Sequence, residues 1–258
     1  MTATPAVTGA PPARSFSVIG NGRAGASFAV ALRAAGWTLV HVFGRDDDPT
    51  HAAADASVVL LTVPDGAIAT VAQRIKPGPA LVAHVAGSLP IDVLAPHRRI
   101  ASLHPLMSLP DPIRGAARLL DRCTFAVAGD PIARSMVADL GGRAVEVADE
   151  DRPLYHAAAC VAANHLVGLC GQVQRLAALV GVPVDAYWKL MTTTLDNVVD
   201  VGPSGALTGP AARGDWTTIQ RHLAHLPASE RASYLTMVEQ AAVLAGRELP
   251  ADLWASTR

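Results

Sequence analysis

This sequence has few lysines, almost no net charge and only three cysteines. Only two lysines, Lys76 and Lys189, occur among 258 residues, against nineteen arginines. The formal net charge is −1 at pH 7, which gives no electrostatic basis for nucleic-acid binding. The three cysteines have unrelated spacings, so we expect neither a disulfide framework nor a metal site, and a reducing, cytoplasmic compartment is favoured.

Long apolar runs and a secretory signal are also missing. We identify no apolar run of the length that a membrane-spanning helix needs, so we predict no membrane partner. The first residues are rich in Ala, Pro and Thr, without the basic start and apolar segment of a signal peptide. We therefore predict a disordered tail over residues 1–15.

A glycine-rich turn joins a short apolar run, 16–20, to an alanine-rich helical segment, 23–35. Between a strand and a helix, G-x-G-x-x-G provides a tight turn, close approach to a pyrophosphate and close helix packing. The free N–H groups of the helix then favour phosphate. The pattern predicts a dinucleotide site, with a ligand-free turn as the alternative. The cofactor-binding residues expected here and after a neighbouring strand are Gly20, Asn21, Gly22, Arg23, Ala24, Gly25, Val63 and Pro64.

Arg45 follows the second predicted strand, 38–43, twenty residues after Gly25. At this place an acidic residue binds the ribose hydroxyls of NAD, whereas an arginine suits the 2′-phosphate of NADP. We therefore favour NADP as the cofactor. The cofactor would instead be NAD if the acidic run 46–48 bound the ribose and Arg45 were only a solvated surface charge.

Predicted strands and helices alternate up to residue 148. The continuous apolar run 57–63 fits a strand that is covered on both faces of a parallel sheet. This alternation predicts an α/β fold with a doubly wound parallel sheet, and Asp65 is expected to cap a helix over 65–75. Only helices are evident from residue 149 onward. We predict a Rossmann-like domain over 16–148 and an all-helical domain over 149–258.

The segment 154–180 predicts one long helix that is apolar nearly all round. Such a helix is buried on all sides. Burial in a subunit interface would make the protein a homodimer through its helical domain, and burial inside the monomer is the alternative.

Loops at the carboxyl ends of the predicted strands should face the reactive part of the cofactor. His104 follows a strand near 99–103, and an imidazole can give or take a proton near neutral pH. We predict an acid–base role for His104, with a capping or backbone-bonding role as the alternative. Ser88 follows the strand 80–85 and is expected either to position the substrate or to cap the next helix.

Polar side chains share one stripe of the long helix. His156, Cys160 and Asn164 recur at i, i+4 and i+8, and polar groups on an apolar helix need partners. We predict His156 as a second acid–base candidate and Asn164 as a substrate-positioning group, with satisfied core residues as the alternative. Asp215 is more simply a helix cap. Further substrate-binding candidates near the glycine-rich loop 202–215 are Asn197, Thr208 and Arg213, the last as a carboxylate clamp.

Several of these motifs together carry a family resemblance. They are Gly20-Asn-Gly-Arg-Ala-Gly25, Ser102-Leu-His-Pro-Leu106, Tyr155-His-Ala-Ala-Ala159 with Asn164, and Ala206-Leu-Thr-Gly-Pro210 followed by Arg213-Gly-Asp215. The chain resembles bacterial oxidoreductases with a Rossmann-like N-terminal domain and a helical C-terminal domain of unknown function. They form a branch of the 6-phosphogluconate dehydrogenase-like superfamily, whose members are commonly dimers through the helical domain.

The sequence departs from this superfamily at one place. β-Hydroxyacid dehydrogenases and ketopantoate reductases carry a lysine early in the first helix of the second domain, where this chain has His156, so neither activity carries over directly. We predict an NADP-dependent oxidoreductase acting on a small carboxylated substrate. A 2-oxo acid, a hydroxy acid or an imino acid would fit, with ketopantoate-like compounds among the candidates. The alternative is a non-catalytic NADP-binding sensor or scaffold.

Overall fold

The computed structural model describes residues 14–255 and divides the chain into two compact units, Met1–His165 and Leu166–Arg258. The sequence predicts the boundary between domains at residue 148. The division lies later because the first turns of the long helix hydrogen-bond to the sheet of the first unit. Most of the predicted tail, 1–13, lies outside the described residues, whereas Ser15 already belongs to a buried strand.

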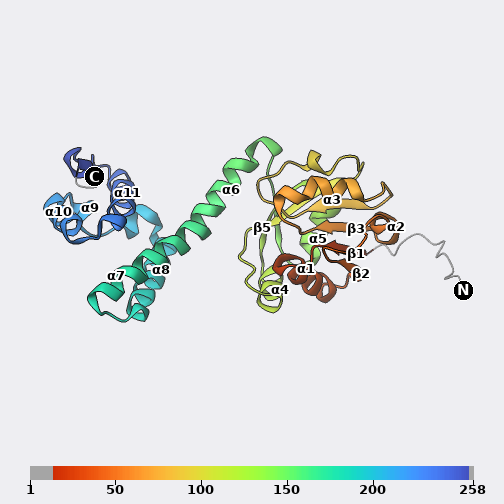
Figure 1. The fold of residues 1–258 in the computed structure, drawn as a ribbon, viewed down its shortest axis with the longest axis horizontal. Helices are drawn as coiled ribbons and strands as arrows, with labels where there is room; N and C mark the ends of the chain where they lie inside the picture. Colours follow the sequence, from red (N-terminus) through yellow and green to blue (C-terminus); the bar gives the residue numbers. More distant parts are fainter. Residues whose placement is uncertain (1–13, 256–258) are drawn as a thin grey trace, which may run out of the picture. The chain divides into compact units, whose positions relative to one another are not determined.

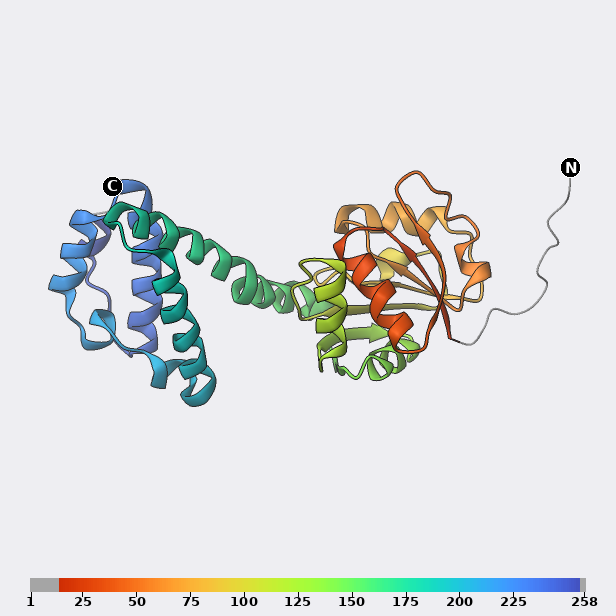
Figure 2. The same ribbon diagram turned by 90° about the horizontal axis from the view of Figure 1, so that it is seen from below.

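A seven-stranded sheet forms the centre of the first unit (Figures 1 and 2), in the order β2-β1-β3-β4-β5-β6-β7. The strands are β1 (Ser15–Ile19), β2 (Thr38–Phe43), β3 (Val58–Leu61), β4 (Leu81–His84), β5 (Ile100–Pro105), β6 (Thr124–Gly129) and β7 (Arg143–Glu146). The first five are parallel to one another. The pair β6 and β7 runs antiparallel to them, a direction that hydrophobic periodicity does not encode. The predicted doubly wound α/β fold is confirmed.

Helices cover both faces of this sheet. They are α1 (Arg23–Ala34), α2 (Ala52–Asp55), η1 (Asp65–Ala67), α3 (Ile68–Arg74), η2 (Ile91–Leu94), α4 (Pro112–Leu120) and α5 (Ile132–Asp139). Strand β3 shows the two-sided core. Val58 and Leu60 pack into the cluster formed with α1, α4 and α5, whereas Val59 and Leu61 pack with α2, α3 and η2. In Figure 1, α1 and α4 lie below the sheet and α3 lies above it.

Two local features of this unit differ from the sequence prediction. Helix α4 was not predicted, although Asp111 caps it by accepting hydrogen bonds from the N–H groups of Ile113 and Arg114. Asp65 does not cap a helix, because the chain enters α3 through the 3-10 turn η1 and Asp65 makes no capping bond.

One helical run continues from the first unit into the second. It comprises the 3-10 turn η3 (Asp149–Asp151), α6 (Arg152–Cys160), the π-helical turn η4 (Val161–His165) and α7 (Leu166–Val180). By length and composition alone, residues 149–180 could cross a membrane, contrary to the expectation that no run reaches that length. This is weak evidence for a span, since core helices of soluble proteins pass the same test.

The second unit is helical throughout its described residues. After α7 it comprises α8 (Val184–Ala206), α9 (Pro210–Arg213), α10 (Trp216–His225), α11 (Ala228–Leu244) and α12 (Asp252–Ala255). The predicted loop 202–215 is therefore partly helical, because α8 continues past a kink at Gly202, where φ is 75°, and α9 follows. Asp215 caps α10 through the N–H of Thr218, as predicted. Apolar side chains of α7 remain exposed, including Val167 at 71%.

Candidate functional site

Two glycines of the loop after β1 are required by the protein's own packing. Gly20 has a φ of 108°, and an added Cβ there would lie 2.9 Å from the Thr62 carbonyl carbon. An added Cβ at Gly25 would overlap the Gly20 carbonyl oxygen, which also accepts a 2.7 Å hydrogen bond from the Thr62 hydroxyl. These contacts hold the loop tightly against the end of β3, so the predicted turn and close packing are present.

Gly22, in contrast, is not required by contacts within the protein. Its φ is −70°, which any residue adopts, and an added Cβ would meet nothing within 4 Å. Gly22 is the N-cap of α1, so no side chain caps the helix, and the first turn holds no acidic residue. The first N–H groups and the positive end of the helix are therefore available to an anion.

This loop lines a pocket of about 360 Å³ at the carboxyl ends of β1, β2 and β3. The connection from β1 leads to β2 on one side and the next strand, β3, lies on the other side. Such a switch point is where open α/β sheets bind ligands. Of the residues predicted to bind the cofactor, Asn21, Val63 and Pro64 line this pocket, whereas Arg23 and Ala24 lie in the first turn of α1.

Two arginines line the same pocket. Arg45 was predicted from its place after β2, whereas Arg74, in the last turn of α3, was not. The Arg74 guanidinium donates a 3.3 Å hydrogen bond to the carbonyl oxygen of Asp47. Nothing local in the sequence marks Arg74, because only the packing of α3 beside β3 brings it to the loop after β2.

The neighbouring carboxylates are bound to their own loop. Asp47 accepts a 2.6 Å hydrogen bond from the N–H of Gly44. Asp48 accepts hydrogen bonds from the hydroxyl and the N–H of Thr50, and these bonds lower the pKa of Asp48. The pocket therefore presents two guanidinium groups, with the Asp47 carboxylate committed to the turn.

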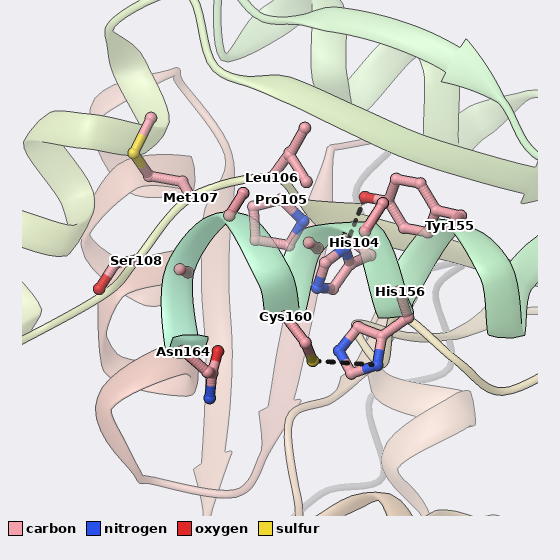
Figure 3. Close-up of a pocket in the computed structure, with 13 residues that line it drawn as sticks. His104, Pro105, Leu106, Met107, Ser108, Tyr155, His156, Cys160 and Asn164 are labelled. Atoms are coloured by element: carbon pink, nitrogen blue, oxygen red, sulfur yellow. Dashed lines mark hydrogen bonds between the residues drawn. The ribbon is translucent and has the colours of Figure 1, made fainter. Parts of the chain in front are cut away.

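A second pocket of the first unit, about 620 Å³, lies beside His104. Figure 3 shows His104, Tyr155, His156 and Cys160 grouped together, with Asn164 and Ser108 toward the other end. His104 comes from β5, and the other three residues of the group come from α6. Tyr155 was not predicted as a site residue, although it stands next to His156 in the sequence.

His104 and Tyr155 form a hydrogen-bonded pair. The His104 Nδ1 and the Tyr155 hydroxyl oxygen are 2.7 Å apart. Burial, followed by the charges of His156, Arg152 and His84, lowers the pKa of His104 to about 4. Burial also raises the pKa of Tyr155. At pH 7 the imidazole is therefore neutral and the tyrosine is protonated. A neutral His104 ring has one nitrogen that donates and one that accepts a hydrogen bond.

The stripe predicted on the long helix does meet in one pocket. His156, Cys160 and Asn164 all line it, and the Cys160 sulfur lies 3.9 Å from Nδ1 of His156. Asn164 belongs to the π-helical turn η4. π-Turns within α-helices are frequent at functional sites.

The loop after β4 closes tightly on the two histidines. An added Cβ at Gly87 would lie 3.0 Å from Nε2 of His104 and would collide with the ring of His156. The fully buried His84 holds this loop, with Nδ1 accepting from the N–H of Ala86 and Nε2 donating to the carbonyl of Pro90. Burial lowers the pKa of His84 to about 4, so His84 makes these two hydrogen bonds with a neutral ring.

Comparison with known proteins identifies part of the chain. Residues 123–241 match a domain of unknown function, DUF2520. This segment includes β6, β7 and most of the described helices that follow them, and it contains Tyr155, His156 and Asn164. Over this segment the match confirms the expected resemblance to proteins with a helical C-terminal domain of unknown function. No curated protein matches the chain.

Solved structures share the fold over nearly the whole chain. A Thermotoga maritima protein is 24% identical, with a TM-score of 0.70 over 90% of this chain and 98% of its own. A Bacteroides fragilis protein, described as a candidate NADP oxidoreductase, is 23% identical, with a TM-score of 0.71 over 90% and 96%. The pyrroline carboxylate reductase of Plasmodium falciparum, solved with NADP bound, is 12% identical, with a TM-score of 0.61 over 96% and 98%. The chain therefore shares the fold of these three proteins, one of which is a reductase solved with NADP bound.

The remaining candidates lie on both sides of the unit boundary. In the first unit, the Ser88 hydroxyl donates a 3.4 Å hydrogen bond to the Asp65 carboxylate. Within the DUF2520 segment, Asn197 is exposed on α8, Thr208 lines a small pocket of the second unit, and Arg213 is exposed at the end of α9. Their parts in a substrate site stay predictions. Among residues 14–255, no group of three or more His, Cys, Asp or Glu side chains could hold a metal ion.

Proposed function

We propose that this DUF2520-containing protein is an NADP-dependent oxidoreductase that transfers a hydride to the carbonyl or imine carbon of a small carboxylated compound, or from the corresponding hydroxy or amino compound in the reverse direction. The observation that supports it is the presence of two complementary pockets along one edge of one sheet. The glycine-loop pocket follows β1, and the His104–Tyr155 pair lies at β5. These strands are three positions apart, about 14 Å at the usual strand spacing, a distance that a bound dinucleotide can span.

The first pocket suits the phosphates of a dinucleotide. The uncapped N-terminus of α1 and the open approach at Gly22 suit the pyrophosphate, and Arg45 with Arg74 suits a 2′-phosphate. When bound, the nicotinamide would supply or accept the hydride. The residues of this chain then have to bind the substrate, orient it and handle the proton.

Tyr155 and His104 are proposed as the proton-transferring pair. A neutral His104 can donate its Nδ1–H to the tyrosine oxygen, which leaves the Tyr155 O–H free to point into the pocket. The same hydrogen bond stabilises the tyrosinate that forms when Tyr155 gives up its proton. His156, which was predicted for this role together with His104, borders the same pocket with its ring centroid 5.7 Å from that of His104.

The proposed substrate is a small carboxylated compound: a 2-oxo acid, a hydroxy acid or an imino acid, with ketopantoate-like compounds included. Pro105, Leu106 and Met107 give the pocket an apolar wall, and its described lining contains no lysine or arginine. Arg213, the predicted carboxylate clamp, belongs to the second unit together with Asn197 and Thr208, and their parts in substrate binding stay predictions. In the first unit, Asn164 lines this pocket and is proposed, with Ser88, to position the substrate.

The decisive experiment is nucleotide binding by fluorescence. The wild type should bind NADPH more tightly than NADH, and Arg45→Ala and Arg74→Ala should each weaken NADPH binding by roughly 10- to 100-fold, the value of one charge-assisted contact. Arg134→Ala is the control, because Arg134 pairs with Glu146 on the opposite edge strand. Equal binding of both nucleotides would make NAD the cofactor, and binding of neither would refute the proposal.

A non-catalytic NADP-binding sensor is the second candidate, motivated by the missing lysine of the related dehydrogenases. Oxidation of NADPH against a panel of 2-oxo acids, cyclic imino acids and uncharged ketones separates the two. A sensor binds NADPH but oxidises it with none of these compounds. Turnover of the uncharged ketones alone would refute the carboxylate proposal while retaining the oxidoreductase.

We also propose that the protein is a cytoplasmic homodimer joined through its helical unit. Large apolar side chains of α7 and α8 are exposed in the single chain, among them Leu179 at 67%, Leu190 at 61% and Val199 at 85%. Exposed apolar surface of this kind marks an interaction site.

A further inference from the structure

Arg152 is a fully buried arginine on α6, a helix that contributes residues to the second pocket. It is the first residue of α6, and its side chain has no solvent exposure. Its Nε donates a 3.1 Å hydrogen bond to the Asp149 carboxylate, and its Nη2 donates to the buried hydroxyl of Ser102 on β5. Its Nη1 is buried without a hydrogen-bond partner among the described residues.

This arginine is one of two links between the same pair of elements. Ser102 and His104 are two apart on β5 and so face the same side of the sheet. Arg152 and Tyr155 are three apart on α6 and so are neighbours on one face of the helix. The Arg152–Ser102 and Tyr155–His104 hydrogen bonds therefore join the first turn of α6 to β5 side by side.

Arg152 is also tied to the loop after β4. The second carboxylate oxygen of Asp149 accepts a 3.1 Å hydrogen bond from the N–H of Ile91, which begins η2. Arg152 and Asp149 thus connect α6, β5 and the segment that follows the loop carrying Gly87. His104 itself lies on β5, bonds to Tyr155 of α6, and lies beside Gly87 of that loop.

Stability alone does not account for such a group. Burying a charged side chain completely carries a desolvation cost that one ion pair often only offsets, and an unpaired buried N–H is costly. A group of this kind in a native protein calls for another explanation. Its position beside the proposed proton-transferring pair supplies one.

We infer that Arg152 is a positioning residue for the Tyr155–His104 pair, clamping α6 to β5 and placing a fixed positive charge beside both side chains. The titratable and charged groups facing His104 are His84 from β4 and Arg152, Tyr155 and His156 from α6. After burial and the charge of His156, the Arg152 charge is the next cause that keeps the pKa of His104 low. It also opposes the effect of burial on the pKa of Tyr155.

The test is an NMR pH titration of the histidine ring resonances in the unliganded full chain, with His104→Gln used to assign His104. In Arg152→Met, which removes the charge and keeps the length, the His104 midpoint should rise by about one pH unit. Arg152→Lys, which keeps the charge, should stay near the wild-type midpoint. Arg114→Met is the matched control, because Arg114 also pairs with an aspartate three residues earlier but is 77% exposed.

An unchanged His104 midpoint in a folded Arg152→Met protein would overturn the inference. If the uncompensated Asp149 prevents folding, Asp149→Asn/Arg152→Met removes both charges and carries the same expectation and the same refutation. A shift in Arg152→Lys as large as that in Arg152→Met would refute the role of the charge.

The use of this pair in catalysis rests on the proposed function, but the titration needs neither cofactor nor substrate. Failure of the nucleotide-binding experiment and failure of the titration are therefore separate results. With a substrate that is turned over, the acid limb of the kcat/KM profile of Arg152→Met should move to higher pH together with the His104 midpoint.

Discussion

Gly20, Gly22 and Gly25 belong to one motif but are required for different reasons. The first and third are held by contacts with the protein itself, at Thr62 and at the Gly20 carbonyl. At Gly22 neither the backbone conformation nor the surroundings exclude a larger residue. Only an approaching ligand would require the absence of a side chain there.

Gly22→Ala should therefore separate binding from folding. We expect NADPH binding to weaken at least about tenfold, while stability changes by less than roughly 1 kcal/mol, because the lost freedom of the unfolded chain is offset by the poorer capping of a helix by alanine. Nucleotide fluorescence and thermal unfolding measure the two effects. Gly66→Ala, also without neighbours within 4 Å of its added Cβ, is the control, and equal NADPH affinity in Gly22→Ala and wild type would contradict a pyrophosphate site.

Tyr155 carries the proposed proton transfer. Tyr155→Phe should lower NADPH turnover with an accepted substrate by about 10²–10⁴-fold and leave NADPH binding unchanged. His104→Ala should act similarly, and His156→Ala tests the other histidine. Tyr234→Phe is the matched control, because the Tyr234 hydroxyl also lies 2.6 Å from a histidine Nδ1, that of His222 in the second unit. Full turnover in Tyr155→Phe would remove Tyr155 from the mechanism.

The loop between β4 and η2 depends on a histidine that stays neutral. His84 is fully buried and uses both ring nitrogens in hydrogen bonds to this loop. Protonation would break the bond from the Ala86 N–H and place a charge in the core. The loop that packs against His104 and His156 is therefore sensitive to acid.

Acid should destabilise the fold between about pH 6.5 and pH 4. His84 and His104 have folded-state pKa values of about 4, whereas an unfolded histidine titrates near 6.5. Over this interval the unfolded chain binds protons that the folded protein does not, so the free energy of unfolding falls by about 1.4 kcal/mol per pH unit for each histidine. Above pH 6.5 this contribution is fully present.

Urea unfolding at pH 7 and pH 5 measures this dependence. His84→Gln, which can still accept and donate one hydrogen bond, should reduce the pH slope, whereas His51→Gln on the surface should not. If the free energy of unfolding depended on pH equally in the wild type and in His84→Gln, protonation of His84 would not contribute to the acid destabilisation.

At the level of the assembled protein, we expect the exposed apolar side chains of α7 and α8 to be buried in a homodimer interface. Light scattering should give twice the mass of one chain, and Leu190→Glu/Val199→Glu should give the mass of a single chain. Ile113→Glu, at a side chain that is 72% exposed in the first unit, is the control. A wild type that runs as a single chain would refute the dimer.

Much of the fold could be predicted, because periodicity and turn residues are local. The alternation of β3 between two core clusters follows from its continuous apolar run. The cap at Asp215 follows from its place before a helix. Helix α4 was not predicted, although its cap Asp111 is a local signal. The antiparallel direction of β6 and β7 could not be predicted, because strand direction depends on how connections pack.

The residues of the candidate site likewise divide into those that the sequence predicted and those that only the structure brought together. The sequence alone determined the glycine loop, the arginine after β2, and the stripe of His156, Cys160 and Asn164, because each depends on spacing within one or two elements. Only the tertiary structure brought Arg74 to Arg45, Tyr155 to His104, and the buried Arg152 to Ser102. These pairs join residues distant in sequence, so their contacts follow from strand order and helix packing rather than from any local pattern.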